Sequence, residues 1–193
     1  MWKGSLQAAL PGTMNALVRR AIPDDAEAIA AVHIQSWQIA YRGQLPGHYL
    51  DHLGNEFEGR NAFWRTEISS PRTRTNEVWV ADSQTQVDGF VAIGPARGAD
   101  PNVTGEIYAI YVNPSRWDQG LGRALFTHAT QRLASLGYST AILWVLESNT
   151  RARRFYEVAG WALDGGAKLE SIPDGIELRE VSYRILFRPE NEE

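Results

Sequence analysis

The segment NPSRWDQGLGRAL, residues 113–125, carries the strongest structural signal in the chain. Asn113-Pro114 predicts the end of a strand, because proline cannot donate a hydrogen bond to a sheet. Gly120 and Gly122 then stand directly before a helical apolar repeat. Such a turn leaves backbone N–H groups and the positive end of a helix dipole free, which together can bind a phosphate without a cationic side chain. The other interpretation is that the glycines simply make a tight strand-to-helix turn.

The segments around this turn show strand and helix patterns in alternation. GEIYAIYV (105–112) predicts a strand, and apolar residues at helical spacing predict a helix that begins at Gly120 and is terminated by Gly137. TAILWVL (140–146) is nearly continuously apolar, as in a strand that is buried on both faces. A helix with a Ser/Asn cap at 149–160 and a last strand at 176–187 follow.

The N-terminal part adds a strand, helices and a hairpin. ALVRRAI (16–22) predicts a strand, and the segment 23–43 predicts an amphipathic helix with Pro23 at its start. Two shorter helical segments, 48–53 and 58–69, precede a hairpin of strands at 77–82 and 88–94. This order indicates an α+β, or mixed α/β, fold in which one sheet carries helices on both faces.

Composition bounds the class of protein. With 193 residues, 44% of them hydrophobic, the chain is long enough for one full core, so we expect a single domain at 14–188 between a loose extension at 1–13 and an acidic tail at 189–193. The net charge of −4 argues against nucleic acid as a partner. No apolar run approaches the roughly 20 residues that span a bilayer, so we expect no membrane partner and a cytoplasmic protein.

Cysteine and histidine chemistry is limited. The chain has no cysteine, which excludes disulfides, thiolate metal sites and a cysteine nucleophile. Of the four histidines only His48 and His52 share helical spacing, so we expect no metal.

Two known phosphate loops are also excluded: the lysine of a P-loop is missing, and Leu125 stands where a dinucleotide fingerprint has its third glycine.

Three segments in order resemble the GCN5-related N-acetyltransferase (GNAT) family. They are GEIYAIYVNP, WDQGLGRAL and NTRARRFYEVAGW, which together cover residues 105–161, and a weaker likeness that includes SWQIAYRGQLP extends over about 15–187. The resemblance implies a twisted, mostly antiparallel sheet flanked by helices, whose fourth and fifth strands splay apart. It also implies that acetyl-CoA, as co-substrate, lies in the cleft between those strands.

The resemblance implies a set of cofactor-binding residues. Backbone amides from about 118 to 123 would take the pyrophosphate, main-chain groups of the preceding strand would pair with the pantetheine arm, and one arginine of the later helix would reach the ribose phosphate. The other interpretation of these arginines is a solvated helix face. The expected cofactor-binding residues are Ile110, Tyr111, Val112, Asp118, Gln119, Gly120, Leu121, Gly122, Arg123, Asn149 and Arg153. Asn149 is also a plausible helix cap.

The resemblance also implies two catalytic residues. Glu106, an acid in an otherwise apolar strand, is the candidate base, directly or through a water, with Glu147 as second choice. Tyr156 is the candidate acid that protonates the leaving thiolate. The structural alternative for Glu106 is a glutamate that faces solvent, and the alternative for Tyr156 is an aromatic residue of the core. Trp37 and Tyr41 would border the acceptor, although plain packing explains them equally.

The function expected from this resemblance is an acetyl-CoA-dependent N-acetyltransferase that transfers acetyl directly to the amine of a small molecule or peptide. A non-catalytic acyl-CoA-binding or regulatory module is the alternative, and a translation-blocking toxin is disfavoured because no basic face for RNA is evident. Small enzymes of this family are often dimers, so the resemblance leaves open whether the protein forms a homodimer. Trp117 departs from the family pattern, which usually has Arg or Gln there, and we expect it to pack beside the loop and fix its shape.

Overall fold

The structure is a computed structural model that describes residues 17–70, 76–83 and 86–187. The expected extension at 1–13 and the acidic tail at 189–193 lie outside the described residues, and so do both expected domain boundaries. The strands are β1 (Leu17–Arg20), β2 (Glu77–Asp82), β3 (Val87–Pro95), β4 (Thr104–Val112), β5 (Thr140–Leu146), β6 (Ala162–Ile172) and β7 (Ile176–Leu186). The α-helices are α1 (Ala26–Ala40), α2 (Gly47–His52), α3 (Phe57–Ser69), α4 (Leu121–Ser135) and α5 (Thr150–Val158).

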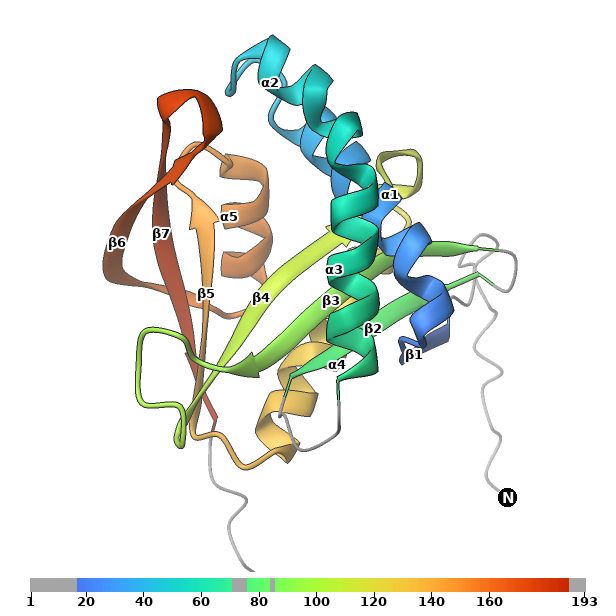
Figure 1. Cartoon of the computed structure of the whole chain (residues 1–193). Coiled ribbons are helices and arrows are strands. Elements are labelled where there is room, and N and C mark those ends of the chain that lie inside the picture. The colour runs from blue at the N-terminus through green and yellow to red at the C-terminus, as the bar shows by residue number, and fades with distance from the viewer. Residues whose placement is uncertain (1–16, 71–75, 84–85, 188–193) are drawn as a thin grey trace, which may run out of the picture.

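All seven strands belong to one sheet, in the order β1-β2-β3-β4-β5-β7-β6. Every neighbouring pair is antiparallel except β4 and β5, which run parallel. Figure 1 shows the strong twist of the sheet and the separation of the β5–β6–β7 part from the β1–β4 part. The mostly antiparallel sheet with helices is therefore confirmed.

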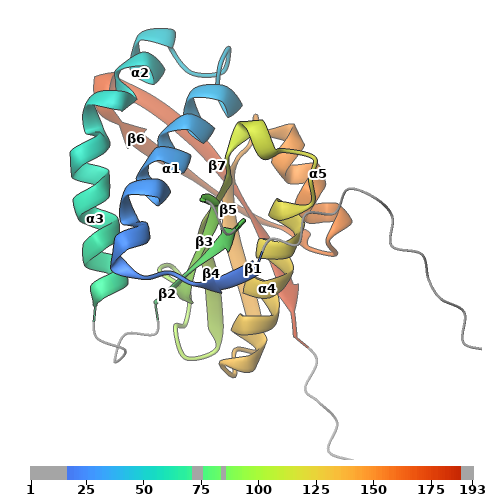
Figure 2. The same ribbon diagram turned by 90° about the vertical axis from the view of Figure 1, so that its right-hand side faces the viewer.

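Helices cover both faces of this sheet, as Figure 2 shows: α1 and α3 lie on one side, and α4 and α5 lie on the other. The α4 side holds the larger core, in which the apolar stripe of α4 packs on β3, β4 and β5. On the other side α1 and α3 pack on β2 and β3 through a second cluster that includes Ile29, Trp64 and Phe90. The periodicity of the helices is what places one apolar stripe against each face.

Two predicted elements differ from those observed. The helix expected over 23–43 divides into a short 3-10 turn, Pro23–Asp25, and α1, which ends at Ala40. No strand was predicted for 162–172, where β6 forms an edge of the sheet. Most of β6 is exposed, so its residues lack the alternation of apolar and polar side chains that marks a half-buried strand.

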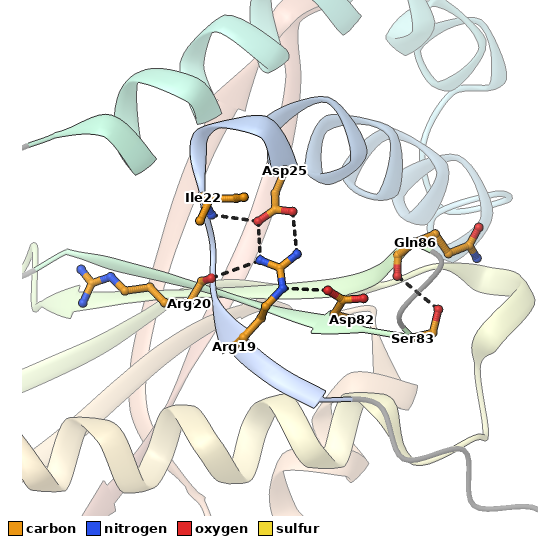
Figure 3. A network of polar contacts seen from close by, with 7 residues as sticks. All are labelled: Arg19, Arg20, Ile22, Asp25, Asp82, Ser83 and Gln86. Atoms are coloured by element: carbon orange, nitrogen blue, oxygen red, sulfur yellow. Dashed lines mark hydrogen bonds and ion pairs between the residues drawn. The ribbon is translucent and has the colours of Figure 1, made fainter.

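An ion-pair network fixes the first strand to the first helix (Figure 3). The Arg19 guanidinium donates from Nη1 and Nη2 to the Asp25 carboxylate at 2.7 and 2.9 Å, and from Nε to Asp82 at 2.7 Å. Asp25 also accepts the backbone N–H of Ile22 at 2.8 Å. These bonds raise the pKa of Arg19. They hold α1, which carries one wall of the cleft described below, on the β1–β2 edge.

Candidate functional site

A cleft opens where β4 and β5 part. The two strands pair only from Thr104 opposite Thr140 to Ile107 opposite Leu143. Directly after Ile107 the pairing of β4 with β3 shifts register by one residue, as in a β-bulge. A bulge increases the local twist and ends regular pairing. The splay of the fourth and fifth strands is therefore present, and the bulge lies where it begins.

The cleft has a volume of about 1290 Å³ and is lined by α1, β4, the glycine turn, α5 and the β5–β7 strands. Most of the expected site residues line it: Trp37, Tyr41, Glu106, Ile110, Tyr111, Val112, Asp118, Gly120, Leu121, Gly122, Arg123, Asn149 and Tyr156. Gln119 and Arg153 are not among the lining residues. The cleft thus brings together expected site residues from five separate elements, and only two of the expected residues are not part of its lining.

The glycine turn presents unpaired amides to this cleft. Gly120 is the N-cap of α4 and has a left-handed conformation with φ 83°, which favours glycine. The first hydrogen bond within α4 runs from the N–H of Ala124 to the carbonyl of Gly120, so the N–H groups of residues 121–123 have no partner within the helix. A Cβ at Gly120 would meet no atom within 4 Å, so its conformation and not crowding favours glycine there. The turn therefore fits an anion.

Trp117 packs beside this turn and joins it to two other elements. Its Nε1 donates to the carbonyl oxygen of Val112, at the end of β4, at 2.8 Å. The Arg151 guanidinium lies over its indole ring, 4.3 Å from the centroid, and pairs with Asp118 at 2.9 Å. The conformation of Asp118 is strained, with φ 60°. Trp117 thus connects β4, the turn and the first residues of α5.

The end of β4 presents backbone groups to the cleft. The N–H of Asn113 donates to the carbonyl oxygen of Asp88 in β3 at 2.8 Å, so by alternation the main-chain groups of Ile110 and Val112 point away from β3. The Val112 carbonyl already accepts two bonds, from Trp117 and from Ser36 Oγ at 3.0 Å. The Val112 N–H and both groups of Ile110 face the side on which β5 has turned away.

Four arginines line the mouth of the cleft at the turn: Arg116, Arg123, Arg151 and Arg154. Arg116 contacts Asp88 at 3.4 Å, whereas Arg154 has no ion pair with any residue of the described part of the chain. Arg153 points elsewhere, because its guanidinium donates to the Tyr183 hydroxyl at 3.2 Å and to the Glu147 carbonyl at 3.0 Å. Of the three arginines on α5, Arg151 and Arg154 therefore line the cleft and Arg153 does not.

Tyr156 lies on the buried face of α5 with its side chain at the cleft. Its ring packs on Phe126 and Tyr183, with centroids 5.3 and 5.9 Å away. Burial raises the pKa of Tyr156, so its hydroxyl stays protonated at neutral pH. No hydrogen bond joins this hydroxyl to another residue within the described ranges. A buried hydroxyl that faces a cleft without a partner is suited to donate a proton to a bound group.

Glu106 lies at the bottom of the cleft, only 2% exposed, in the part of β4 that still pairs with β5. One of its oxygens accepts the backbone N–H of Arg97 at 2.8 Å, and the other accepts Arg97 Nη2 and Nε at 2.7 and 3.2 Å. The solvent-facing alternative for Glu106 is therefore wrong. Glu147, the second choice, pairs with Arg179 at 2.9 Å and is not among the lining residues.

Helix α1 forms one wall of the cleft. Trp37 Nε1 donates to the Tyr111 hydroxyl at 2.9 Å, and the Trp37 and Tyr41 rings meet edge to face at 5.0 Å. Tyr111 stacks on His33 at 4.7 Å. Burial raises the pKa of Tyr41 and of Tyr111. Asn149 caps α5 by accepting the Ala152 N–H at 3.1 Å, and it also lines the cleft.

The opposite wall comes from β5, β6 and β7 and was not predicted. Lys168 of β6 lies with its Nζ 4.6 Å from the ring centroid of Trp144 and 3.0 Å from a carboxylate oxygen of Glu180. All three side chains line the cleft. The sequence signal for this wall was weak, because β6 was not recognised as a strand. The pairing of Lys168 with Glu180 follows from the β6–β7 register.

Among residues 17–70, 76–83 and 86–187 there is no cluster of three or more His, Asp or Glu side chains that could hold a metal ion. None of the helices in these same ranges has the length and apolar character required to cross a membrane.

Comparisons with known proteins agree with this geometry. The profile of the Acetyltransferase (GNAT) family matches residues 34–161. An uncharacterised N-acetyltransferase of Bacillus subtilis, YuaI, is 37% identical over 134 residues, which are 68% of this chain and 72% of that protein. A probable N-acetyltransferase of Mycobacterium tuberculosis is 29% identical over 174 residues, 89% of this chain and 94% of that protein.

Solved structures share the fold. The PaiA N-acetyltransferase of Thermoplasma acidophilum, in complex with coenzyme A, superposes with a TM-score of 0.67 at 17% identity, over 90% of this chain and 99% of that one. A putative acetyltransferase of Salmonella typhimurium, YncA, solved with acetyl-CoA, has a TM-score of 0.67 at 17% identity, over 93% and 98% of the two chains. Together with the family profile, these matches show that the chain belongs to the GNAT family of acetyltransferases.

Proposed function

We propose that the protein is an acetyl-CoA-dependent N-acetyltransferase that transfers the acetyl group directly to the primary amine of a small molecule or peptide. The observation that carries this proposal is the cleft between β4 and β5, which has unpaired α4 amides at one end and a buried, protonated tyrosine hydroxyl inside it. Relatives named as N-acetyltransferases and fold neighbours solved with coenzyme A or acetyl-CoA support it.

The donor half of the cleft suits the parts of a CoA molecule. The N–H groups at the start of α4 suit its pyrophosphate, and Arg123 stands on the first turn of that helix. The N–H and carbonyl of Ile110 and the N–H of Val112 suit the amides of its pantetheine arm, as an added strand would pair. Arg154, and Arg151 if it leaves Asp118, suit the ribose phosphate.

Acetyl-CoA supplies the acetyl thioester, and the chain supplies proton transfer and positioning. In the proposal Tyr156 donates its proton to the leaving sulfur, because its raised pKa keeps the hydroxyl protonated. Glu106 takes the proton of the amine through a water, and the ion pair with Arg97 fixes the direction of its carboxylate. Trp37 and Tyr41 border the acceptor. A direct transfer agrees with the absence of cysteine from the chain.

Two measurements test this proposal. Calorimetric titration with acetyl-CoA should show binding, and release of CoA thiol should depend on an added amine within a panel of small amines and peptides. Binding without thiol release for every amine would favour the alternative, a non-catalytic acyl-CoA-binding module. Absence of binding would contradict both.

A further inference from the structure

The chain contains only two lysines, Lys3 and Lys168, beside seventeen arginines. Lys3 lies outside the described residues. Lys168 lies in the cleft of an acetyltransferase, on the wall formed by β5, β6 and β7. An arginine would make the same ion pair, but only a lysine can lose its proton at moderate cost and act as a nucleophile. The lysine at this position therefore has a chemical property that the arginines lack.

The surroundings of Lys168 resemble those that an amine acceptor requires. Its Nζ lies over the Trp144 ring, 4.6 Å from the centroid, which is a favourable place for an ammonium group. The Glu180 carboxylate lies 3.0 Å away, within reach to accept a proton from Nζ. The Lys168 side chain is 41% exposed, so the surrounding residues do not enclose it.

Trp144 connects this amine to the point where the strands part. It directly follows Leu143, the last β5 residue that pairs with β4, and Tyr108 directly follows the partner Ile107. Trp144, Tyr108 and Lys168 all line the same cleft. Lys168 thus lies over a residue that directly follows the last pair of the splaying strands.

We propose that Lys168 is an internal acceptor, which the enzyme acetylates on Nζ from acetyl-CoA when no other amine occupies the cleft. The inference rests on the proposed function. Glu180 takes one proton from the Lys168 ammonium, and the freed electron pair forms a C–N bond to the thioester carbonyl carbon. The C–S bond breaks, the sulfur leaves with a proton as CoA thiol, and one proton passes to solvent. The product is the neutral amide of Lys168.

Acetylation would change the cleft as well as the lysine. The neutral amide cannot pair with Glu180 or occupy the ring face of Trp144 as a cation. The carboxylate and the indole then become available to the ammonium group of an external acceptor. Lys168 would therefore control access to the site that it occupies.

Mass spectrometry of the purified full chain incubated with acetyl-CoA alone tests the inference. The other lysine of the sequence, Lys3, serves as the internal reference. We expect Lys168 to be modified at least about tenfold faster than Lys3, because an amine held in the cleft has a high effective concentration. The rate should not change on dilution of the protein, since the reaction lies within one chain, and excess CoA should slow it.

Two variants sharpen this test. Lys168→Arg keeps the cation but should remove the fast modification and leave that of Lys3 unchanged. Glu180→Gln removes the proton acceptor and should slow modification of Lys168 severalfold, in protein whose circular dichroism shows it is folded. Modification of Lys168 no faster than Lys3, or a rate that falls in proportion to dilution, would overturn the inference. If acetyl-CoA binds and added amines release thiol while Lys168 stays unmodified, the inference fails and the proposed function stands; if acetyl-CoA does not bind, the proposed function itself fails.

Discussion

The indole Nε1 of Trp117 donates a hydrogen bond to the carbonyl oxygen of Val112 at 2.8 Å. The same oxygen accepts Ser36 Oγ of α1 at 3.0 Å. The last residue of β4 is therefore held from two sides, by the turn before α4 and by the helix that lines the acceptor wall. The family pattern usually has Arg or Gln at position 117. Here Trp117 supports the shape of the turn through its hydrogen bond to Val112 and through the contact of its ring with Arg151.

Replacing Trp117 tests whether this support matters for the donor. We expect Trp117→Ala to weaken acetyl-CoA binding about tenfold, because the turn loses both the bond to Val112 and the ring under Arg151. Trp117→Phe keeps a ring and should lose only about threefold. Calorimetry measures both, with Trp79→Phe as control, since that change removes an indole bond to Glu77 outside the cleft. Equal affinity in all variants would leave Trp117 without a role in binding.

Two adjacent arginines give a matched pair for the ribose phosphate. Arg154 lines the cleft, whereas Arg153 is bonded to Tyr183 and Glu147. We expect Arg154→Ala to weaken CoA binding about fivefold, with no effect on dephospho-CoA, because a phosphate loses a charge-assisted partner. Arg153→Ala should leave both affinities unchanged. The reverse order of the two variants would contradict the assignment.

Tyr156→Phe should lower kcat about 100-fold with little change in acetyl-CoA affinity, because the ring remains and only the proton donor is lost. The matched control is Tyr138→Phe, at a buried tyrosine of the same core that does not line the cleft. Because burial raises the pKa of Tyr156, its ionisation should not produce a fall in kcat between pH 7 and about 9. Steady-state rates across this range check both statements. A Tyr156→Phe enzyme with unchanged kcat would remove the tyrosine from the mechanism.

Glu106→Gln should lower kcat at saturating donor by about 100-fold, since the amide keeps the side chain's shape but cannot accept the amine's proton. Glu147→Gln, at a residue that does not line the cleft, should change kcat by less than about twofold, because substitutions at surface positions usually have small effects. Calorimetry should show acetyl-CoA affinity within about threefold of the original protein for both. If the two variants lose kcat equally, or neither does, Glu106 is not the base.

The partly buried His33 should make the protein less stable in mild acid. Burial and the nearby Arg60 lower the pKa of His33 from 6.5 to about 3. Between these values the unfolded chain binds a proton that the folded protein excludes, so the free energy of unfolding falls as the pH decreases. The expected loss from pH 7 to pH 5 is about 2 kcal/mol for this group.

Urea unfolding at the two pH values measures this loss. His33→Gln should remove most of it, whereas His52→Gln, at an exposed position, should leave it unchanged. An equal pH dependence in the original protein and in His33→Gln would contradict the neutral state of this histidine.

The sequence predicted most of the fold because the buried elements carry strong patterns. The apolar run of β5 can be recognised directly from the sequence. So can the helical apolar stripe of α4, in which Leu125 and Leu133 are fully buried. The edge strand β6 has exposed residues on both faces, including Leu163 and Leu169, so no alternation marked it. Propensity alone does not distinguish such a strand from a loop, because its pairing with β7 is set by tertiary contacts.

The candidate site divides in the same way. Residues within short motifs, such as Gly120, Asn149 and Tyr156, could be identified from sequence because one local segment sets their positions. Arg97 and Lys168 could not, because each meets its partner only in the folded sheet. Arg97 follows the end of β3 and reaches Glu106 of β4, and Lys168 lies opposite Glu180 in the β6–β7 register. The sequence also could not distinguish Arg153, which does not line the cleft, from Arg154, which does, because neighbouring helix positions face different directions.

A crystal structure of the protein with CoA tests the central claim most directly. We predict that the pyrophosphate accepts hydrogen bonds from the N–H groups of residues 118–123, that the pantetheine arm pairs with Ile110 and Val112, and that the Tyr156 hydroxyl lies within hydrogen-bond distance of the sulfur. A pyrophosphate bound away from the start of α4, or a sulfur outside the gap between β4 and β5, would contradict the account.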